Sequence, residues 1–189
     1  MAEDRVRRRR NPEQTRNAII DALLELLKAG QFAPTTKDIA ARAATSERSI
    51  FVHFPGRDDL TIAAVDRQSE AVESLIETVS PELPLEQRVE SAVRQSAAIF
   101  ALQRHPRVLG LLGSQVLPAM DIRMRLTDRR IRESLRRSFA PEVDGDEELL
   151  DTVDATLGWP FRQHLVERLG RSEAEASAAV RRTLLGLLR

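Results

Sequence analysis

The stretch from Pro34 to Phe54 constrains the fold of this 189-residue chain more than any other. It predicts two short helices, from about Thr36 to Ala43 and from about Glu47 to Phe54, joined by a tight turn. Hydroxyl side chains precede both helices, and their oxygens accept hydrogen bonds from backbone N–H groups that are free at a helix start. These candidate caps are Thr35 or Thr36 for the first helix and Thr45 or Ser46 for the second.

The second short helix has two unlike faces. Ile50 and Phe54 are four residues apart and share one face, which predicts that both are core residues. Ile39 and Phe32 are predicted to join them in the core. The other face carries mainly polar side chains, namely Glu47, Arg48 and Ser49, together with Val52. Two short helices with a polar outer face on the second are typical of a helix-turn-helix, whose second helix fits the major groove of DNA.

Three motifs in this region carry a family resemblance. They are Lys28-Ala29-Gly30-Gln31-Phe32, the run from Thr35 to Ala40, and Ser49-Ile50-Phe51-Val52-His53-Phe54 with Arg57 beyond it. Their order resembles the amino-terminal domain of the TetR family of transcriptional regulators, over roughly residues 12 to 66. The chain departs from the family pattern at Ala44, where Gly is usual, and at Phe51, where Tyr is usual. The rest of the chain resembles the family in length, in helical character and in its final helix pair.

The resemblance and the helix faces together imply a set of DNA-contacting residues. Lys37, Glu47, Arg48 and Ser49 lie at helix starts that can face base edges, although Glu47 can equally cap its own helix. Arg57 matches the position of a phosphate contact in the family. The predicted set is Thr36, Lys37, Glu47, Arg48, Ser49, Phe51, His53 and Arg57, and the predicted partner is double-stranded operator DNA.

The first ten residues are rich in arginine. Residues 1–60 carry 11 basic and 9 acidic side chains, whereas Lys+Arg and Asp+Glu are both 29 over the whole chain. Arg8, Arg9 and Arg10 are therefore added to the predicted DNA contacts, as an arm that reaches phosphates or a minor groove. The alternative is a solvated tail. Asn11 and Pro12 then predict the start of the first helix.

Composition excludes several classes of protein. The chain has no cysteine, which leaves no disulfide framework or thiol nucleophile and fits a cytoplasmic location. No apolar run approaches the ~20 residues of a membrane span, and the basic start is not followed by the apolar stretch of a signal peptide. The three histidines lack metal-ligand spacing and no catalytic motif is found, so we expect no metal, no cofactor and no enzyme activity.

Helical periodicity continues through the rest of the chain. A connecting helix is expected over 58–79 and a helix over 85–103, followed by helices over 108–117 and 121–138. A loop over 141–145 precedes a helix over 146–169 that Pro160 should kink or unwind. A capping box at Ser172 opens the last helix. The expected domains are 1–57 for DNA binding, 58–79 as the connecting helix, and 80–189 for ligand binding and dimerisation.

The last helix and the kinked helix suggest two further sites. In the TetR family the final helix pair forms a four-helix dimer interface, so a homodimer is predicted through Leu184, Leu185 and Leu188. Proline-broken helices leave gaps between helices, which predicts a largely apolar pocket for a small apolar effector. Its polar groups are expected from Gln115, Arg123, Gln163 and His164. The candidate pocket residues are Phe100, Gln115, Met120, Met124, Trp159, Phe161, Gln163 and His164.

The sequence thus predicts an all-α fold, with a small N-terminal helix-turn-helix domain and a larger helical-bundle domain for ligand binding and dimerisation. The predicted function is a sequence-specific DNA-binding transcriptional regulator, a repressor released by its ligand. The alternative is a helical protein that uses its helix-turn-helix for nonspecific chromosomal DNA or for a partner protein.

Overall fold

The structure is a computed structural model that describes residues 12–189. Arg8, Arg9 and Arg10, predicted to contact DNA, and Asn11, predicted to cap the first helix, lie outside the described residues. Helices are the only regular elements between residues 12 and 189, which confirms the all-α prediction. The chain forms two compact units, Met1–Arg67 and Gln68–Arg189.

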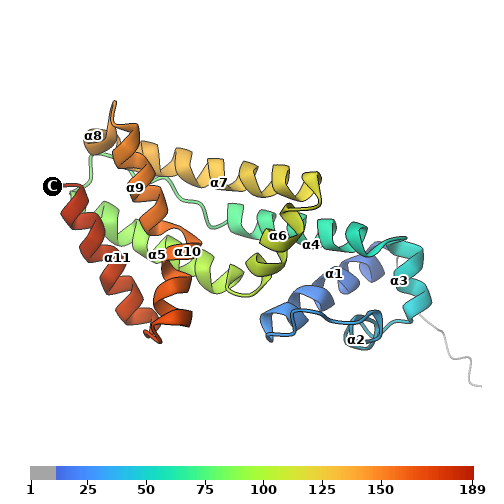
Figure 1. The fold of residues 1–189 in the computed structure, drawn as a ribbon. Helices are drawn as coiled ribbons and strands as arrows, with labels where there is room; N and C mark the ends of the chain where they lie inside the picture. The colour runs from blue at the N-terminus through green and yellow to red at the C-terminus, as the bar shows by residue number, and fades with distance from the viewer. Residues whose placement is uncertain (1–11) are drawn as a thin grey trace, which may run out of the picture. The chain divides into compact units, whose positions relative to one another are not determined.

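The N-terminal unit contains α1 (Pro12–Lys28), α2 (Thr36–Arg42), α3 (Glu47–His53) and the start of α4 (Arg57–Glu73) (Figure 1). The ends of α2 and α3 agree with the predicted ends to within one residue. Both α2 and α3 pack against α1. Ile39, Ile50 and Phe54 are buried, as predicted, beside the apolar face of α1. That face consists of Ile19, Ile20, Ala22, Leu23, Leu24 and Leu27.

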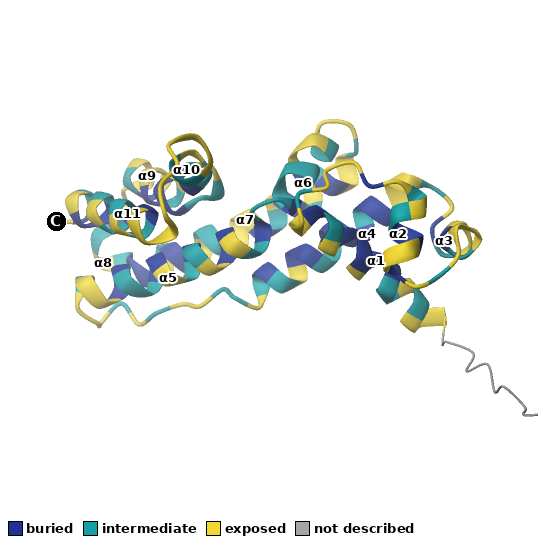
Figure 2. Ribbon diagram, turned by 90° about the horizontal axis from the view of Figure 1, so that it is seen from below, coloured by how far each residue is buried: buried dark blue, intermediate teal, exposed yellow. Residues whose placement is uncertain are grey.

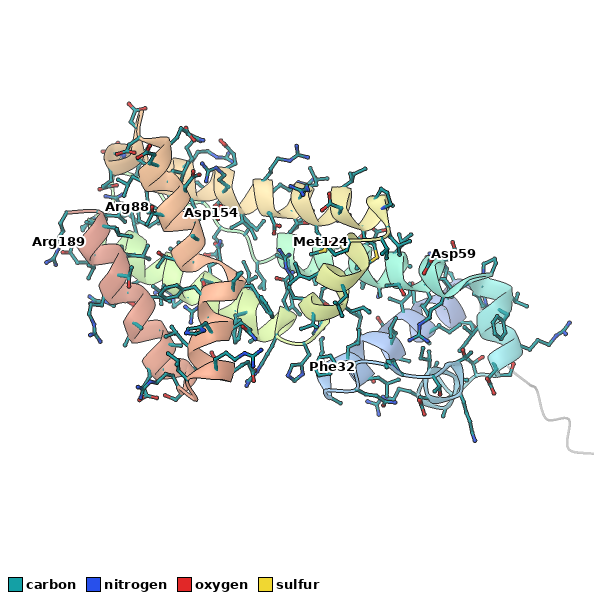
Figure 3. The ribbon with its side chains drawn as sticks, viewed as in Figure 1. Phe32, Asp59, Arg88, Met124, Asp154 and Arg189 are labelled. Atoms are coloured by element: carbon teal, nitrogen blue, oxygen red, sulfur yellow. The ribbon has the colours of Figure 1, made fainter. Side chains whose placement is uncertain are left out.

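Phe32 is not a core residue, contrary to the prediction. Its side chain is 49% exposed, on the connection between α1 and α2 (Figure 3). Gly30, with a φ of +86°, ends α1, and the backbone N–H of Gln31 then donates to the carbonyl of Leu26. The side-chain amide of Gln31 also donates to Asp38, at 3.0 Å. These bonds hold the connection at the surface, and the core is filled by residues of the helices.

The C-terminal unit is a bundle of helices of unequal length (Figure 1). Its long helices α5 (Leu85–Gln103), α9 (Glu147–Leu157) and α11 (Glu173–Leu187) pack against one another, and α6 (Pro106–Ser114) packs on α7 (Pro118–Ser138). The remaining elements are α8 (Ala140–Val143), α10 (Trp159–Gln163) and a π-helical turn, η1 (His164–Arg168). The core cluster comprises Val89, Ala92, Val93, Leu135, Phe139, Val143, Leu150, Val153, Leu157, Val180, Leu184, Leu185 and Leu188.

The helix predicted over 58–79 ends earlier, at Glu73. Residues 76–80 are not helical, and side chains of neighbouring helices satisfy their backbone groups instead. The Ser134 hydroxyl donates to the carbonyl of Glu77 at 2.7 Å, and the N–H of Val79 donates to Ser138 at 3.0 Å. Backbone groups need partners when they leave a helix, and α7 supplies them here.

Two further elements differ from the prediction. The expected loop over 141–145 begins with the short helix α8. The helix expected over 146–169 is interrupted, but at Gly158, which lies between α9 and α10 with an extended backbone. Pro160 sits in the first turn of α10, where the missing N–H of proline has no intrahelical acceptor to lose. The capping box at Ser172 is confirmed at the start of α11.

Candidate nucleic-acid interface and effector cavity

Side-chain caps fix both helices of the helix-turn-helix. At the start of α2, the N–H of Asp38 donates to the Thr35 hydroxyl, and the Asp38 carboxylate accepts from the backbone N–H of Thr35 at 2.8 Å. The hydrogen bonds from Thr35 lower the pKa of the Asp38 carboxyl. At the start of α3, the Ser46 hydroxyl accepts from the N–H of Ser49 at 3.1 Å. The caps are therefore Thr35 and Ser46 among the predicted alternatives.

The turn between α2 and α3 places Ala44 in the left-handed region, with a φ of +50°. Its N–H donates to the carbonyl of Ala41, and the N–H of Thr45 donates to the carbonyl of Ala40. This bonding pattern is a Schellman motif, in which the left-handed residue is usually glycine. The turn therefore keeps the geometry that glycine favours while carrying a Cβ.

The outer face of α3 exposes large side chains to solvent. Only Ile50 of this helix is buried, and Figure 2 shows α3 largely in the colours of exposed and intermediate residues. Arg48 is exposed and, two residues from Ile50, lies on the opposite side of the helix. Phe51 and Val52 are 59% and 71% exposed, although both are apolar. Val52 was absent from the predicted contact set, and its signal in the sequence is its place on the helix face opposite Ile50. Exposed apolar groups beside a charged one suit contact with thymine methyl groups in a major groove.

The other residues predicted to contact DNA differ in their exposure to solvent. Lys37 on α2 and Glu47 on α3 are exposed, whereas Thr36, Ser49 and His53 are half-buried. Arg57 begins α4 and donates through Nη2 to the carbonyl of Pro34, at 3.1 Å. Arg57 is thus part of the attachment between α4 and the connection that precedes α2.

Polar contacts brace α1 against the rest of the N-terminal unit. Glu25 of α1 accepts from Arg42 of α2 at 2.5 Å. Arg67 of α4 reaches back to Asp21 and Asn17, both at 2.8 Å. The guanidinium of Arg16 lies over the Phe54 ring at 5.0 Å, a cation–π contact at the end of α3. These contacts orient α3 relative to α1.

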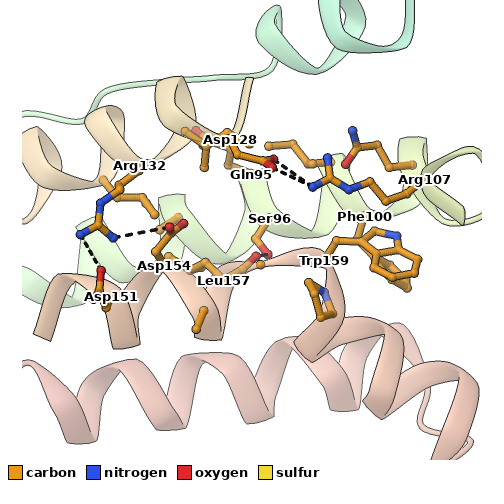
Figure 4. Close-up of a pocket in the computed structure, with 18 residues that line it drawn as sticks. Gln95, Ser96, Phe100, Arg107, Asp128, Arg132, Asp151, Asp154, Leu157 and Trp159 are labelled. Carbon is orange, nitrogen blue, oxygen red and sulfur yellow. Dashed lines mark hydrogen bonds and ion pairs between the residues drawn. The ribbon is translucent and has the colours of Figure 1, made fainter. Parts of the chain in front are cut away.

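The C-terminal unit contains a cavity of about 460 Å³ (Figure 4). Its walls come from α5, α7, α9 and the start of α10, with one residue from α6. A volume in this range is typical of pockets for small molecules. The lining residues are Ala92, Gln95, Ser96, Ile99, Phe100, Gln103, Arg107, Asp128, Ile131, Arg132, Leu135, Asp151, Asp154, Ala155, Leu157, Gly158, Trp159 and Pro160.

Two of the eight candidate pocket residues, Phe100 and Trp159, line this cavity. Met120 and Met124 (the latter labelled in Figure 3) are buried but face α6. A Cβ on Gly113 or Gly110 would approach their thioethers to 3.0 Å or less. Those glycines therefore allow the α6–α7 packing that occupies both methionines. Gln115, Phe161, Gln163 and His164 do not line the cavity. The helix breaks at Gly158, and of the residues after this break only Trp159 and Pro160 line the cavity.

The polar groups of the cavity also differ from the prediction. None of the four expected residues, Gln115, Arg123, Gln163 and His164, lines it, and five charged side chains do. Arg107 donates to both carboxylate oxygens of Asp128 at 3.0 Å. Arg132 lies 2.6 Å from the Asp151 carboxylate and 3.6 Å from that of Asp154. Burial raises the pKa of the Asp154 carboxyl, although Arg132 opposes this.

Behind the cavity wall lies a fully buried arginine, which sequence reasoning missed. Arg162 donates to the Ser96 hydroxyl, the Val93 carbonyl and the Ser177 hydroxyl at 2.8, 2.9 and 3.1 Å. Ser96 lines the cavity and donates in turn to the Leu157 carbonyl at 2.6 Å. Burial lowers the pKa of the Arg162 guanidinium. Nothing in its sequence position distinguishes Arg162 from the exposed arginines.

The predicted dimer residues are buried within one chain. Leu184 is fully covered, and Leu185 and Leu188 belong to the same core cluster. Within one subunit these leucines are therefore core side chains, and the dimer interface through them stays a prediction. The exposed positions of α11 are instead small or charged, namely Glu173, Ala174, Glu175, Ala178, Arg182 and Gly186.

No group of histidine, cysteine or acidic side chains within residues 12–189 has an arrangement that could hold a metal ion. Among the same residues, no helix is both long enough and apolar enough to cross a membrane.

The N-terminal unit thus contains a helix-turn-helix, and the C-terminal unit is a separate bundle of helices. Residues 19–64 match the family model described as bacterial regulatory proteins, tetR family. The chain thus carries the amino-terminal domain of the TetR family, which confirms the resemblance drawn from its motifs. A comparison of the sequence with curated proteins finds no match.

Solved structures share the fold along nearly the whole chain. A transcriptional regulator from Rhodococcus sp. Rha1 is 16% identical with a TM-score of 0.71, over 94% of this chain and 95% of that one. The TetR-like regulator LfrR from Mycobacterium smegmatis, in complex with proflavine, is 19% identical with a TM-score of 0.66, over 94% and 97%. The multidrug binding protein EbrR, complexed with imidazole, is 19% identical with a TM-score of 0.66, over 92% and 94%.

Proposed function

We propose that this protein is a sequence-specific DNA-binding transcriptional regulator that inserts α3 into the major groove. The main support for this proposal is the outer face of α3, where Arg48, Phe51 and Val52 are exposed. The buried side chain of Ile50 anchors this helix in the core. Apolar side chains in water cost free energy that contact with bases would recover. Arg48 would bond to base edges, since an arginine pairs bidentately with guanine.

The regulator would act as a homodimer. A two-fold dimer presents two copies of α3 to half-sites about 34 Å apart, which is one turn of DNA, and so requires a near-palindromic operator. The outer face of α11 supports this assembly, because Ala174, Ala178 and Gly186 are small and exposed and allow close approach of a second helix. This proposed surface is an alternative to the leucines of the sequence prediction. A DNA-bound regulator of this kind works in the cytoplasm.

We further propose that the cavity binds a small effector that releases the protein from its operator, which makes it a repressor. Two relatives of the same fold, LfrR and EbrR, were solved with proflavine and with imidazole. An effector changes DNA affinity only if it binds the released conformation more tightly than the DNA-bound one. The coupling free energy of such systems is typically about 1–3 kcal/mol.

A route for this coupling exists within the C-terminal unit. Glu73, at the end of α4, accepts hydrogen bonds from Arg123 at 3.0 Å, from Thr127 at 3.1 Å and from Arg130, all on α7. The same helix lines the cavity through Asp128. A ligand that displaces α7 would therefore pull on the last turn of α4.

A second attachment involves the opposite wall. Gln95 of α5 lines the cavity, and its side-chain oxygen accepts from the backbone N–H of Glu77 at 2.8 Å. Glu77 follows α4 in the chain, so both walls of the cavity are tied to the end of this helix. Because α4 begins at Arg57, directly after the helix-turn-helix, its movement is the proposed signal.

Selection from a random pool of double-stranded DNA tests the function. The full chain is incubated with the pool and excess nonspecific competitor, and bound sequences are read after several rounds. We expect a near-palindromic site whose half-sites are one or more helical turns apart. Arg48→Ala should change the selected bases, and Arg137→Ala, at an exposed arginine on α7, is the matched control. Binding without enrichment of any sequence would favour the alternative, a nonspecific chromosomal protein.

A further inference from the structure

The cavity of the C-terminal unit has two chemically different ends. Figure 4 shows Arg132, Asp151 and Asp154 at one end and Phe100 and Trp159 at the other, where Arg107, paired with Asp128, lies beside the rings. Apolar side chains such as Ile99 and Leu157 line the space between them. A ligand that fills the cavity would therefore meet a charged end and an aromatic end at once.

At the charged end, Asp154 is the carboxylate with the weakest pairing to a cation. Arg132 directs one nitrogen to Asp151 at 2.6 Å and to Glu147 at 3.1 Å. Its other terminal nitrogen lies 3.6 Å from the Asp154 carboxylate, beyond hydrogen-bond distance. Asp154 is also the least exposed of the three aspartates in the cavity wall. A ligand with a charged donor would complete its pairing.

At the aromatic end, one polar group lacks a partner. The rings of Phe100 and Trp159 lie 6.3 Å apart and are tilted by 41°. The indole Nε1–H of Trp159 is buried, and it has no hydrogen-bond partner among residues 12–189. A buried donor without an acceptor destabilises the state that contains it. A flat ligand that turns the indole slightly and offers an acceptor atom would remove this penalty.

The cations near the cavity are better satisfied than these two groups. Arg107 makes two equal hydrogen bonds to Asp128, and Arg162 lies behind Ser96 with three oxygen acceptors. An anionic ligand would have to displace one of these pairings. A cationic ligand would instead strengthen the weak pairing of Asp154, whose cation partner Arg132 lies 3.6 Å away.

We propose that the cavity binds a flat aromatic molecule with a positively charged amine, which places the amine on Asp154 and the rings against Phe100 and Trp159. This names the class of effector and rests on the proposed regulatory function for its biological role. A volume of about 460 Å³ accommodates two or three fused rings. The binding chemistry itself depends only on the cavity.

Equilibrium binding to the purified full chain tests the class of ligand. The cationic probe is proflavine, a flat three-ring amine, followed by its own fluorescence polarisation. The anionic probe of similar size is anilinonaphthalene sulfonate. Asp154→Asn keeps the shape of the side chain and removes its charge. We expect it to weaken proflavine binding at least about tenfold, the loss typical of a hydrogen bond to a charged group. Binding of the anionic probe should be unchanged or stronger.

Asp151→Asn is the matched control, because Asp151 lines the same cavity but is more exposed and directly paired to Arg132. We expect less than about a threefold effect, since exposed charge pairs contribute little. Proflavine should also quench Trp159, the only tryptophan of the chain. Equal proflavine affinity for the parent and Asp154→Asn proteins would overturn the proposal, as would tighter binding of the anionic probe to the parent.

Release of the selected operator is measured separately, with the Asp154→Asn protein as the control for insertion of proflavine into DNA. Asp154-dependent binding without release would refute the effector role and leave the ligand class standing. Release that does not depend on Asp154 would refute the ligand class and leave the regulatory function standing.

Discussion

The two candidate sites depart from ordinary packing in opposite directions. On α3, the apolar side chains of Phe51 and Val52 are left in water. In the C-terminal unit, the charged side chain of Arg162 is fully buried and that of Asp154 is half-buried. Both arrangements cost stability when no ligand is present. The contrast indicates that the α3 surface suits a large polar partner that also offers apolar groups. The cavity suits a small molecule that carries a charge.

The largest expected effect concerns a charge placed where nothing can pair with it. Leu184→Glu puts a carboxylate into the core cluster, and we expect a loss of about 3–5 kcal/mol in the free energy of unfolding. Denaturant unfolding followed by far-UV circular dichroism measures it. Ala178→Glu, on the exposed face of α11, should preserve stability, because the new carboxylate can pair with Arg182 one turn on.

The same pair of variants separates the core from the proposed dimer surface. Sedimentation velocity should show the parent as a dimer and Ala178→Glu as a folded monomer, since a long charged side chain blocks close helix approach. If Ala178→Glu remains a dimer, the interface lies elsewhere. If Leu184→Glu folds normally and only dissociates, the burial of Leu184 has been misassigned.

The next effect concerns the charge of the DNA-binding surface. Residues 12–67 carry 7 basic and 8 acidic side chains, whereas residues 1–11 carry five arginines. Deleting residues 1–10 should therefore weaken binding to all DNA sequences and reduce the slope of log affinity against log salt by up to about four. Fluorescence anisotropy of labelled operator over a range of salt concentrations measures the slope. An unchanged slope would assign the arm to solvent, the alternative that the sequence leaves open.

Base contacts should have smaller and more selective effects. Arg48→Ala is expected to cost about 1–3 kcal/mol of operator binding and to relax preference at particular base pairs. Val52→Ala should cost less, and mainly at thymines. Arg57→Ala is the comparison, since Arg57 also holds the carbonyl of Pro34. It should weaken all sequences alike and lower the melting temperature slightly. A changed base preference in Arg57→Ala would contradict its assignment as a positioning residue.

The two sites also differ in how far they could be predicted from the sequence, because the helix-turn-helix depends on local contacts and the cavity on distant ones. The ends of α2 and α3 are set by bonds that span three or four residues, such as those of Thr35 with Asp38, so local patterns predict them. The cavity is assembled from residues of α5, α6, α7, α9 and α10, which no single stretch of sequence brings together. A pattern within one helix favours Pro160 as the break, whereas the break lies at Gly158, and Phe161, Gln163 and His164 do not line this cavity.

The burial of individual side chains could not be predicted either, because it depends on packing between segments that are far apart in the sequence. Leu184 and an exposed leucine look alike in the sequence, and only the packing of α11 against α5 and α9 covers it. Arg162 gives no local signal either, because its acceptors Ser96 and Val93 come from a helix more than sixty residues earlier. Phe32 shows the converse, since a large apolar residue next to a glycine turn stays exposed.

Asp154→Asn should have opposite effects on stability and on ligand binding. Burial raises the folded-state pKa of Asp154 above its unfolded value of 3.8, so ionisation of this carboxyl destabilises the fold. The favourable contribution of the protonated acid is complete below pH 3.8 and is lost as the pH rises through the raised pKa. At pH 7 the asparagine variant should therefore melt at a higher temperature than the parent.

This advantage of Asp154→Asn should disappear as the pH falls below 3.8, where the parent carboxyl is protonated as well. Thermal melts between pH 3 and pH 8 measure it. The groups that face Asp154 are Arg132, Asp128 and Asp151, and of these Arg132 keeps its bonds to Asp151 and Glu147 in the variant. A variant less stable than the parent at pH 7 would mean that the Arg132 pairing outweighs the burial of Asp154.

The smallest expected effect concerns the turn of the helix-turn-helix. Ala44 adopts a φ of +50° in a Schellman motif, and a left-handed conformation costs a residue with a Cβ about 1–2 kcal/mol. Ala44→Gly removes that cost but makes the unfolded chain more flexible, so a net gain of about 0.5–1 kcal/mol in stability is expected.

Gly30→Ala is the matched reverse change, because Gly30 ends α1 with a φ of +86° and a Cβ there would meet no atom within 4 Å. It should lose a similar amount through backbone strain alone. Both changes lie outside the outer face of α3, so the selected operator sequence should stay the same while the melting temperatures move in opposite directions. If Ala44→Gly instead lowered stability, the left-handed turn would have to be held by contacts of the Ala44 methyl group.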